Sequence, residues 1–91
     1  MSKNIEMPSD KAFVNICKLS IQHEKPIHFY FYNDSLKNQV IIRTKDNEKI
    51  IWKNEEEHSS PILKTFQCDN VFIIITENSI HIISSNTKIE K

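Results

Sequence analysis

Residues 71–84, VFIIITENSIHIIS, hold two apolar, β-branched runs on either side of Glu77-Asn78. Such runs joined by two polar residues are typical of a β-hairpin with a tight turn. The turn sets the register, and one face then carries the pairs Ile75 with Ile80, Ile73 with Ile82 and Val71 with Ser84. The opposite face carries the pairs Ile74 with His81 and Phe72 with Ile83. Both faces of this hairpin are therefore mostly apolar.

The segment around Asp46-Asn47 predicts a second hairpin of the same kind. A two-residue turn there pairs Ile42 with Ile51 on one face and Ile41 with Trp52 on the other. One amphipathic helix can cover only one face of such a sheet. Because large exposed apolar patches are rare on monomers, we expect the second face to be buried by closure into a small barrel, by another copy of the chain or by another protein.

A single helix is expected before the strands. Pro8-Ser9-Asp10 is a helix-start signal with Ser9 as the N-cap, and Pro26 predicts that the helix ends near His23 or Glu24. Its polar stripe is expected to face away from the core and consists of Lys11, Asn15, Lys18 and Gln22. Beyond Pro26 the pattern predicts five or six strands, near residues 27–33, 39–45, 48–53, 61–67, 71–76 and 79–84.

These elements predict an α+β fold, in which the N-terminal helix packs on a five- or six-stranded twisted antiparallel sheet. The sheet is either open or closed as a small barrel. A single domain is expected over residues 9–85, between a flexible N-terminal segment, residues 1–8, and a frayed C-terminal tail, residues 86–91.

The composition excludes several common functions. The chain has 91 residues, with 12 Lys+Arg against 12 Asp+Glu and no glycine. Without glycine there is no P-loop, dinucleotide-binding turn, nucleophile elbow or EF-hand loop, because each needs positive φ or a close approach of phosphate to the backbone. A net charge of zero argues against non-specific attraction to nucleic acid or to an anionic membrane. We therefore do not expect an enzyme.

Neither a leader peptide nor a membrane span is expected. Residues 1–10 lack an apolar stretch, and the longest apolar run, residues 71–75, is far too short to cross a membrane. The expected location is intracellular, in the cytoplasm or nucleus, or in the host cell or virion if the protein is viral.

Cysteines and histidines give no metal-binding pattern. Cys17 and Cys68 are far apart and are expected to be buried free thiols. The four histidines, at positions 23, 28, 58 and 81, never fall at a spacing that aims two ligands at one metal. We expect no metal and no cofactor, with a composite zinc site of His23, His28 and Cys17 as the alternative. The run EEEHSS, residues 55–60, is expected to be a solvated loop rather than a catalytic group.

The two-faced hairpins suggest a function. We expect a non-enzymatic protein-binding or self-associating module, with a protein partner or a homo-oligomer. The residues expected at its interface are Phe72, Ile74, His81 and Ile83. Burial of His81 would lower its pKa.

The segment IHFYFY, residues 27–32, suggests an alternative function. Strand alternation points Ile27, Phe29 and Phe31 to the core and leaves an aromatic strip on the other side. This strip could stack nucleobases or contact a protein partner, and its members with the flanking lysines are His28, Tyr30, Tyr32, Lys25 and Lys37. Single-stranded nucleic-acid binding is therefore the alternative, although positive charge near the strip is sparse.

Two family resemblances are present. The helix from Ser9 to His23, the strand opening KPIHFY at residues 25–30 and the bent hairpins resemble the layout of Sm-like and Hfq-like RNA-binding barrels. The glycines and short polar loops that contact RNA in those families are absent, so no RNA-binding residue is carried over. Residues 53–62, KNEEEHSSPI, and 76–82, TENSIHI, are similar to small β-rich proteins of large DNA viruses that infect protists. That family has no established activity, so the resemblance implies a viral origin and no mechanism.

Overall fold

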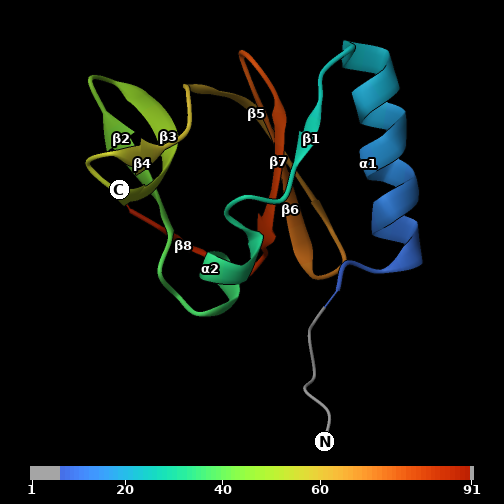
Figure 1. The fold of residues 1–91 in the computed structure, drawn as a ribbon, viewed down its shortest axis with the longest axis horizontal. Coiled ribbons are helices and arrows are strands. Elements are labelled where there is room, and N and C mark those ends of the chain that lie inside the picture. Colours follow the sequence, from blue (N-terminus) through green and yellow to red (C-terminus); the bar gives the residue numbers. More distant parts are fainter. Residues whose placement is uncertain (1–6, 91) are drawn as a thin grey trace, which may run out of the picture.

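The computed structural model describes residues 7–90, which form one long helix, one short helix and two four-stranded sheets (Figure 1). Most of the expected flexible segment, residues 1–6, and the last residue of the expected tail lie outside the described residues. The α+β class predicted from the sequence is confirmed.

The long helix, α1, spans Asp10–His23, close to the predicted bounds. Ser9 is its N-cap, as predicted, and the Ser9 Oγ accepts a hydrogen bond of 3.1 Å from the Ala12 N–H. Glu24 ends the helix in a left-handed conformation, and its N–H donates to the carbonyls of the last turn. The side chains of Ala12 and Ile16 are buried against the sheet.

The first sheet has the strand order β1-β7-β6-β5. Its strands are β1 (Ile27–His28), β7 (Ile80–Ser84), β6 (Val71–Thr76) and β5 (Ile62–Cys68). The β6–β7 hairpin has the predicted register, with Ile75 opposite Ile80 and Ile74 opposite His81. The tight turn is held by the Thr76 N–H, which donates to the Ser79 carbonyl at 2.9 Å.

The second sheet has the strand order β4-β3-β2-β8. Its strands are β4 (Glu57–His58), β3 (Glu48–Asn54), β2 (Ile41–Lys45) and β8 (Lys88–Ile89). The β2–β3 hairpin also has the predicted register, and Asp46 and Asn47 have φ angles of 52° and 68°, as a type I′ hairpin turn requires. β8 pairs in parallel with β2, so part of the segment expected to fray forms a short strand.

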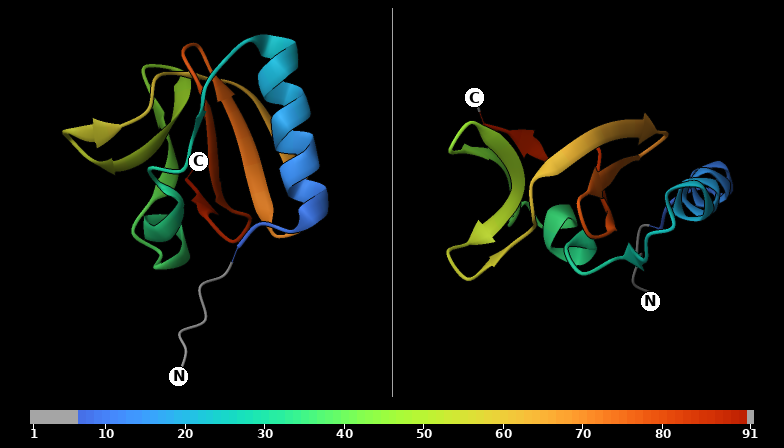
Figure 2. Two further views of the ribbon diagram at one scale, coloured as in Figure 1. Left: turned by 45° about the vertical axis from the view of Figure 1, so that its right-hand side comes forward. Right: turned by 90° about the horizontal axis from the view of Figure 1, so that it is seen from above.

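The expected single antiparallel sheet is replaced by two sheets that do not close into a barrel. Residues 7–90 contain eight strands rather than five or six, and β1 with β7 and β2 with β8 are parallel pairs. Figure 2 shows α1 on one side of the first sheet and the second sheet on the other. The second apolar face of the β6–β7 hairpin is therefore covered by the β2–β3 hairpin of the same chain.

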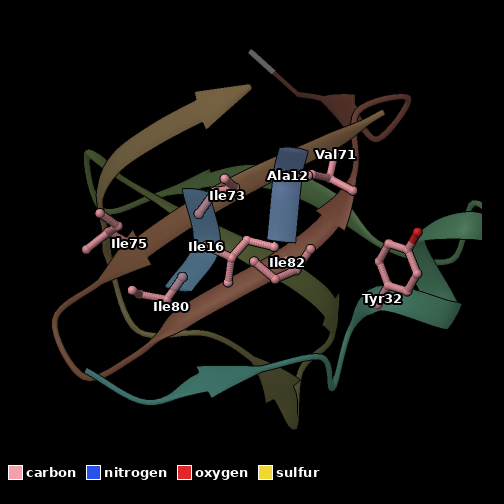
Figure 3. Close-up of a cluster of buried hydrophobic side chains, with 8 residues drawn as sticks. All are labelled: Ala12, Ile16, Tyr32, Val71, Ile73, Ile75, Ile80 and Ile82. Carbon is pink, nitrogen blue, oxygen red and sulfur yellow. The ribbon is translucent and has the colours of Figure 1, made fainter. Parts of the chain in front are cut away.

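Two apolar clusters fill the spaces between these three layers. The helix-side cluster lies between α1 and the first sheet (Figure 3) and contains Ala12, Ile16, Tyr32, Val71, Ile73, Ile75, Ile80 and Ile82. The inter-sheet cluster contains Phe31, Val40, Ile42, Ile51, Ile74 and Ile83. Side-chain alternation in β6 and β7 sends neighbouring isoleucines into different clusters.

The predicted first strand, residues 27–33, is wrong beyond His28. The chain turns at Phe29, whose carbonyl accepts from the Tyr32 N–H at 3.0 Å, and then forms the short helix α2 (Tyr32–Leu36). Ser35 anchors α2 against β7, since its Oγ accepts from the Ser84 N–H at 2.9 Å. Neither α1 nor α2, the helices found within residues 7–90, is long and apolar enough to span a membrane.

Candidate functional site

The four residues expected at an interface lie between the two sheets. Ile74 and Ile83 are 0% exposed, and they pack against the inter-sheet cluster. Phe72 is half-buried beside the same cluster, and His81 is buried. The prediction that this face is open for a partner is therefore corrected, because the second sheet already covers it.

The aromatic strip expected on residues 27–32 is not formed. His28 is exposed and Tyr30 is 61% exposed, but Tyr32 is buried in the helix-side cluster. The reason is the turn at Phe29, which ends strand alternation and places Tyr32 at the start of α2. Lys25 is also removed from such a site, because its Nζ donates to the Thr76 carbonyl.

Lys37 is exposed directly after α2, on a different element from β1. Of the residues expected in a nucleic-acid site, the structure therefore removes Tyr32 and Lys25, whereas His28 and Tyr30 line one hollow.

Three of the four histidines meet instead in a hollow of about 390 Å³, which we call the histidine pocket. It is lined by His28, Tyr30, Phe31, Glu56, Glu57, His58, Ser59, Ser60, Asn78, Ser79 and His81. The rings of His28 and His81 are stacked with their centroids 5.6 Å apart, and the Ser79 Oγ lies 3.0 Å from the His81 Nε2. Sequence spacing did not indicate this convergence, because β1, β4 and β7 are brought together only by the tertiary fold.

His81 is the most strongly perturbed group of the histidine pocket. Burial, followed by the nearby charge of His28, lowers its pKa to about 4, in the direction predicted from the sequence. Its Nδ1 is buried and has no hydrogen-bond partner among residues 7–90. A histidine with this pKa and no orienting acid is a weak base, so the Ser79–His81 pair is poorly suited to nucleophilic catalysis.

The run EEEHSS, residues 55–60, is expected to be a solvated loop, but two of its residues form β4. Ser59 is buried, and its Oγ accepts from the Ile51 N–H at 2.9 Å. The His58 ring stacks on Trp52 at a centroid distance of 5.9 Å. Within residues 7–90, no group of three or more His, Cys, Asp or Glu side chains could hold a metal ion.

A larger hollow of about 510 Å³ lies between α1 and β5, and we call it the β5 groove. It is lined by Lys11, Asn15, Lys18, Leu19 and Gln22 of α1 and by Phe66, Gln67, Cys68, Asp69 and Ile73 of the first sheet or its turn. Leu19, Phe66 and Ile73 supply its apolar surface, and Lys11 and Lys18 are exposed at its border. The polar stripe of α1 that was expected to face away from the core therefore forms one wall of this groove.

The β5 groove runs beside an unusual sheet edge. Of the four sheet edges in the described part of the chain, β1, β4 and β8 have two residues each, whereas β5 has seven. Very short edge strands protect a sheet from pairing with other chains. A register shift between Ile62 and Lys64 disturbs the start of β5, so its regular edge covers residues 64–68.

The cysteines are free, as expected, but neither is buried, so the prediction of buried thiols is wrong. Cys17 is exposed on α1, and Cys68 is half-buried in the β5 groove, where it accepts a hydrogen bond of 3.3 Å from the Asn15 Nδ2.

No protein-family model, no curated protein and no solved structure matches this chain.

Proposed function

We propose that this chain is a non-enzymatic protein-binding module that adds an extended segment of a partner protein to its first sheet, beside β5. The observation that supports this proposal is the coincidence of the long free edge of β5 with the β5 groove. Strand addition at a sheet edge is a common mode of peptide recognition, in which main-chain hydrogen bonds supply affinity and pockets for alternate side chains supply specificity.

The edge and the groove would contribute in different ways. In the described residues β5 pairs only with β6, so its outer N–H and C=O groups remain available for an added strand. Alternate side chains of that strand would point toward α1 and reach the apolar surface of Leu19 and Phe66. Phe66 is 39% exposed, and covering it would add hydrophobic stabilisation to the backbone pairing.

Charge favours a foreign segment over a second copy of the chain. Lys11 and Lys18 border the groove, and Lys64 lies on the same face of β5. Pairing β5 with β5 of another copy would bring a second Lys64 to this positive border, and like charges across neighbouring strands are destabilising.

The test is selection of binding peptides from a random displayed library, followed by hydrogen exchange of the complex. We expect selected peptides to slow amide exchange in residues 64–68, and we expect Phe66→Lys to abolish their binding. Ile89→Lys is the matched control, because Ile89 is 45% exposed but lies in β8 of the second sheet. Peptides that bind the Phe66→Lys variant normally, or a β5-paired dimer of the chain itself, would contradict the proposal.

A further inference from the structure

We infer that the partner segment carries a carboxylate, an apolar residue and a second carboxylate at alternate positions of one extended stretch. In this arrangement the apolar side chain enters the β5 groove, and the two carboxylates face its lysines. The inference rests on the proposed strand addition and specifies the chemistry of the segment that is added.

The relative direction of α1 and β5 determines which lysine faces which end of the added strand. The Ser9 hydroxyl donates to the Asp69 carboxylate, and the Asn15 Nδ2 donates to the Cys68 Sγ. The start of α1 therefore lies at the end of β5, and the helix runs opposite to the strand. Lys11 is thus near the Cys68 end of the edge, and Lys18 is closer to its beginning.

The register of β5 shows which of its side chains share the α1 face. Lys64, Phe66 and Cys68 are opposite Ile75, Ile73 and Val71, which all belong to the helix-side cluster. Residues of an added strand that lie beside these three would also face α1. The middle one lies next to the exposed ring of Phe66, where an apolar side chain is favoured.

The charges on either side of Phe66 favour carboxylates at the outer two positions. Lys18 and Lys64 are exposed at one end, and Lys11 is exposed at the other. Asp69 is the one carboxylate among the described residues that line the groove, and it already accepts a hydrogen bond from the Ser9 hydroxyl. The groove border is therefore positive on balance, most strongly at the Lys18 and Lys64 end.

The spacing of the lysines fits this pattern. Lys11 and Lys18 are seven residues apart on α1, which corresponds to about 10 Å along the helix axis. Positions i and i+4 of an extended strand are about 13 Å apart, a difference that flexible lysine side chains can cover. Exposed ion pairs are weak, so the carboxylates would select among extended segments more than they would raise affinity.

The test uses three synthetic peptides in NMR titrations of the whole chain. They are acetyl-Thr-Glu-Thr-Leu-Thr-Glu-Thr-amide and its two analogues with both glutamates replaced by glutamine or by lysine. At low salt we expect the glutamate peptide to bind about tenfold more tightly than the lysine peptide, with chemical-shift changes in residues 64–68. We expect this preference to shrink at about 0.5 M salt, because exposed charges are screened.

Charge reversal supplies the matched variants. Lys11→Glu combined with Lys18→Glu is expected to reverse the preference in favour of the lysine peptide. Lys45→Glu combined with Lys49→Glu, in the exposed end of the β2–β3 hairpin, is expected to leave it unchanged. Equal binding of all three peptides at β5 would overturn this inference and leave the proposed strand addition intact. If neither these peptides nor library-selected ones affect residues 64–68, both proposals are wrong.

Discussion

At the scale of single residues, His81 connects burial to the pH dependence of folding. Its pKa is about 4 in the folded chain, against an ordinary value of 6.5, so the unfolded chain takes up a proton at higher pH than the folded chain does. Above about pH 6.5 His81 is neutral in both the folded and the unfolded chain, and the free energy of unfolding is not reduced by its protonation. As the pH falls from about 6.5 toward 4, the unfolded chain binds this proton more readily than the folded chain, so the free energy of unfolding decreases. We expect urea unfolding to show a loss of about 2 to 3 kcal/mol from this residue between pH 7 and pH 4.5.

The control separates His81 from the carboxylates, which also titrate in acid. His81→Phe should remove this part of the pH dependence, whereas His58→Gln should retain it, because His58 is exposed. An unfolding free energy that falls equally with pH in wild type and His81→Phe would show that His81 is not responsible.

The burial of His81 is predictable from its place opposite Ile74 in the hairpin. Its contact with His28 is not, because β1 pairs with β7 from a distant part of the chain.

At the scale of elements, several ends of helices and hairpins have a residue in the left-handed conformation, although the chain has no glycine to adopt it. Positive φ occurs at five described residues, and four of them are asparagine or aspartate: Asn38, Asp46, Asn47 and Asp69. Asparagine and aspartate tolerate the left-handed conformation better than other residues that have a β-carbon. Glu24 is the exception, with φ of 54° at the end of α1.

Glu24→Gly is therefore expected to stabilise the protein. Glycine adopts left-handed geometry without the steric cost that a glutamate bears, and we expect a gain of about 1 kcal/mol in the free energy of unfolding. Lys18→Gly is the matched change within α1, and there the loss of helix propensity should cost about 1 kcal/mol. Chemical denaturation measures both, and destabilisation by Glu24→Gly would contradict the argument.

At the scale of the whole molecule, the inter-sheet cluster makes the two sheets depend on each other. Ile51 of β3 is fully buried and belongs to the same cluster as Ile74 and Ile83 of the first sheet. Ile51→Ala should lower the free energy of unfolding by about 2 to 5 kcal/mol, through lost burial and a cavity. In native-state hydrogen exchange we expect β6 and β7 to lose protection together with β2 and β3, as one cooperative unit.

Leu63→Ala is the control for this prediction, because Leu63 is exposed at the irregular start of β5 and its truncation should change stability by less than about 0.5 kcal/mol. If Ile51→Ala accelerated exchange in β2 and β3 alone, the two sheets would be independently stable. The hairpin pattern predicts that the Ile74 face packs against a partner. This prediction is wrong, because the β2–β3 hairpin of the same chain covers that face.

Helix α1, its Ser9 cap and the register of both hairpins could be predicted from the sequence, because each depends on side-chain periodicity and turn residues within about 15 positions of one another. The sequence could not show that the hairpins belong to different sheets, that residues 32–36 form a helix, or that β5 is the long unpaired edge among residues 7–90. These features depend on long-range packing, since an apolar face requires burial without specifying the surface that buries it. Which surface covers each face depends on how the turns and loops direct the chain in three dimensions.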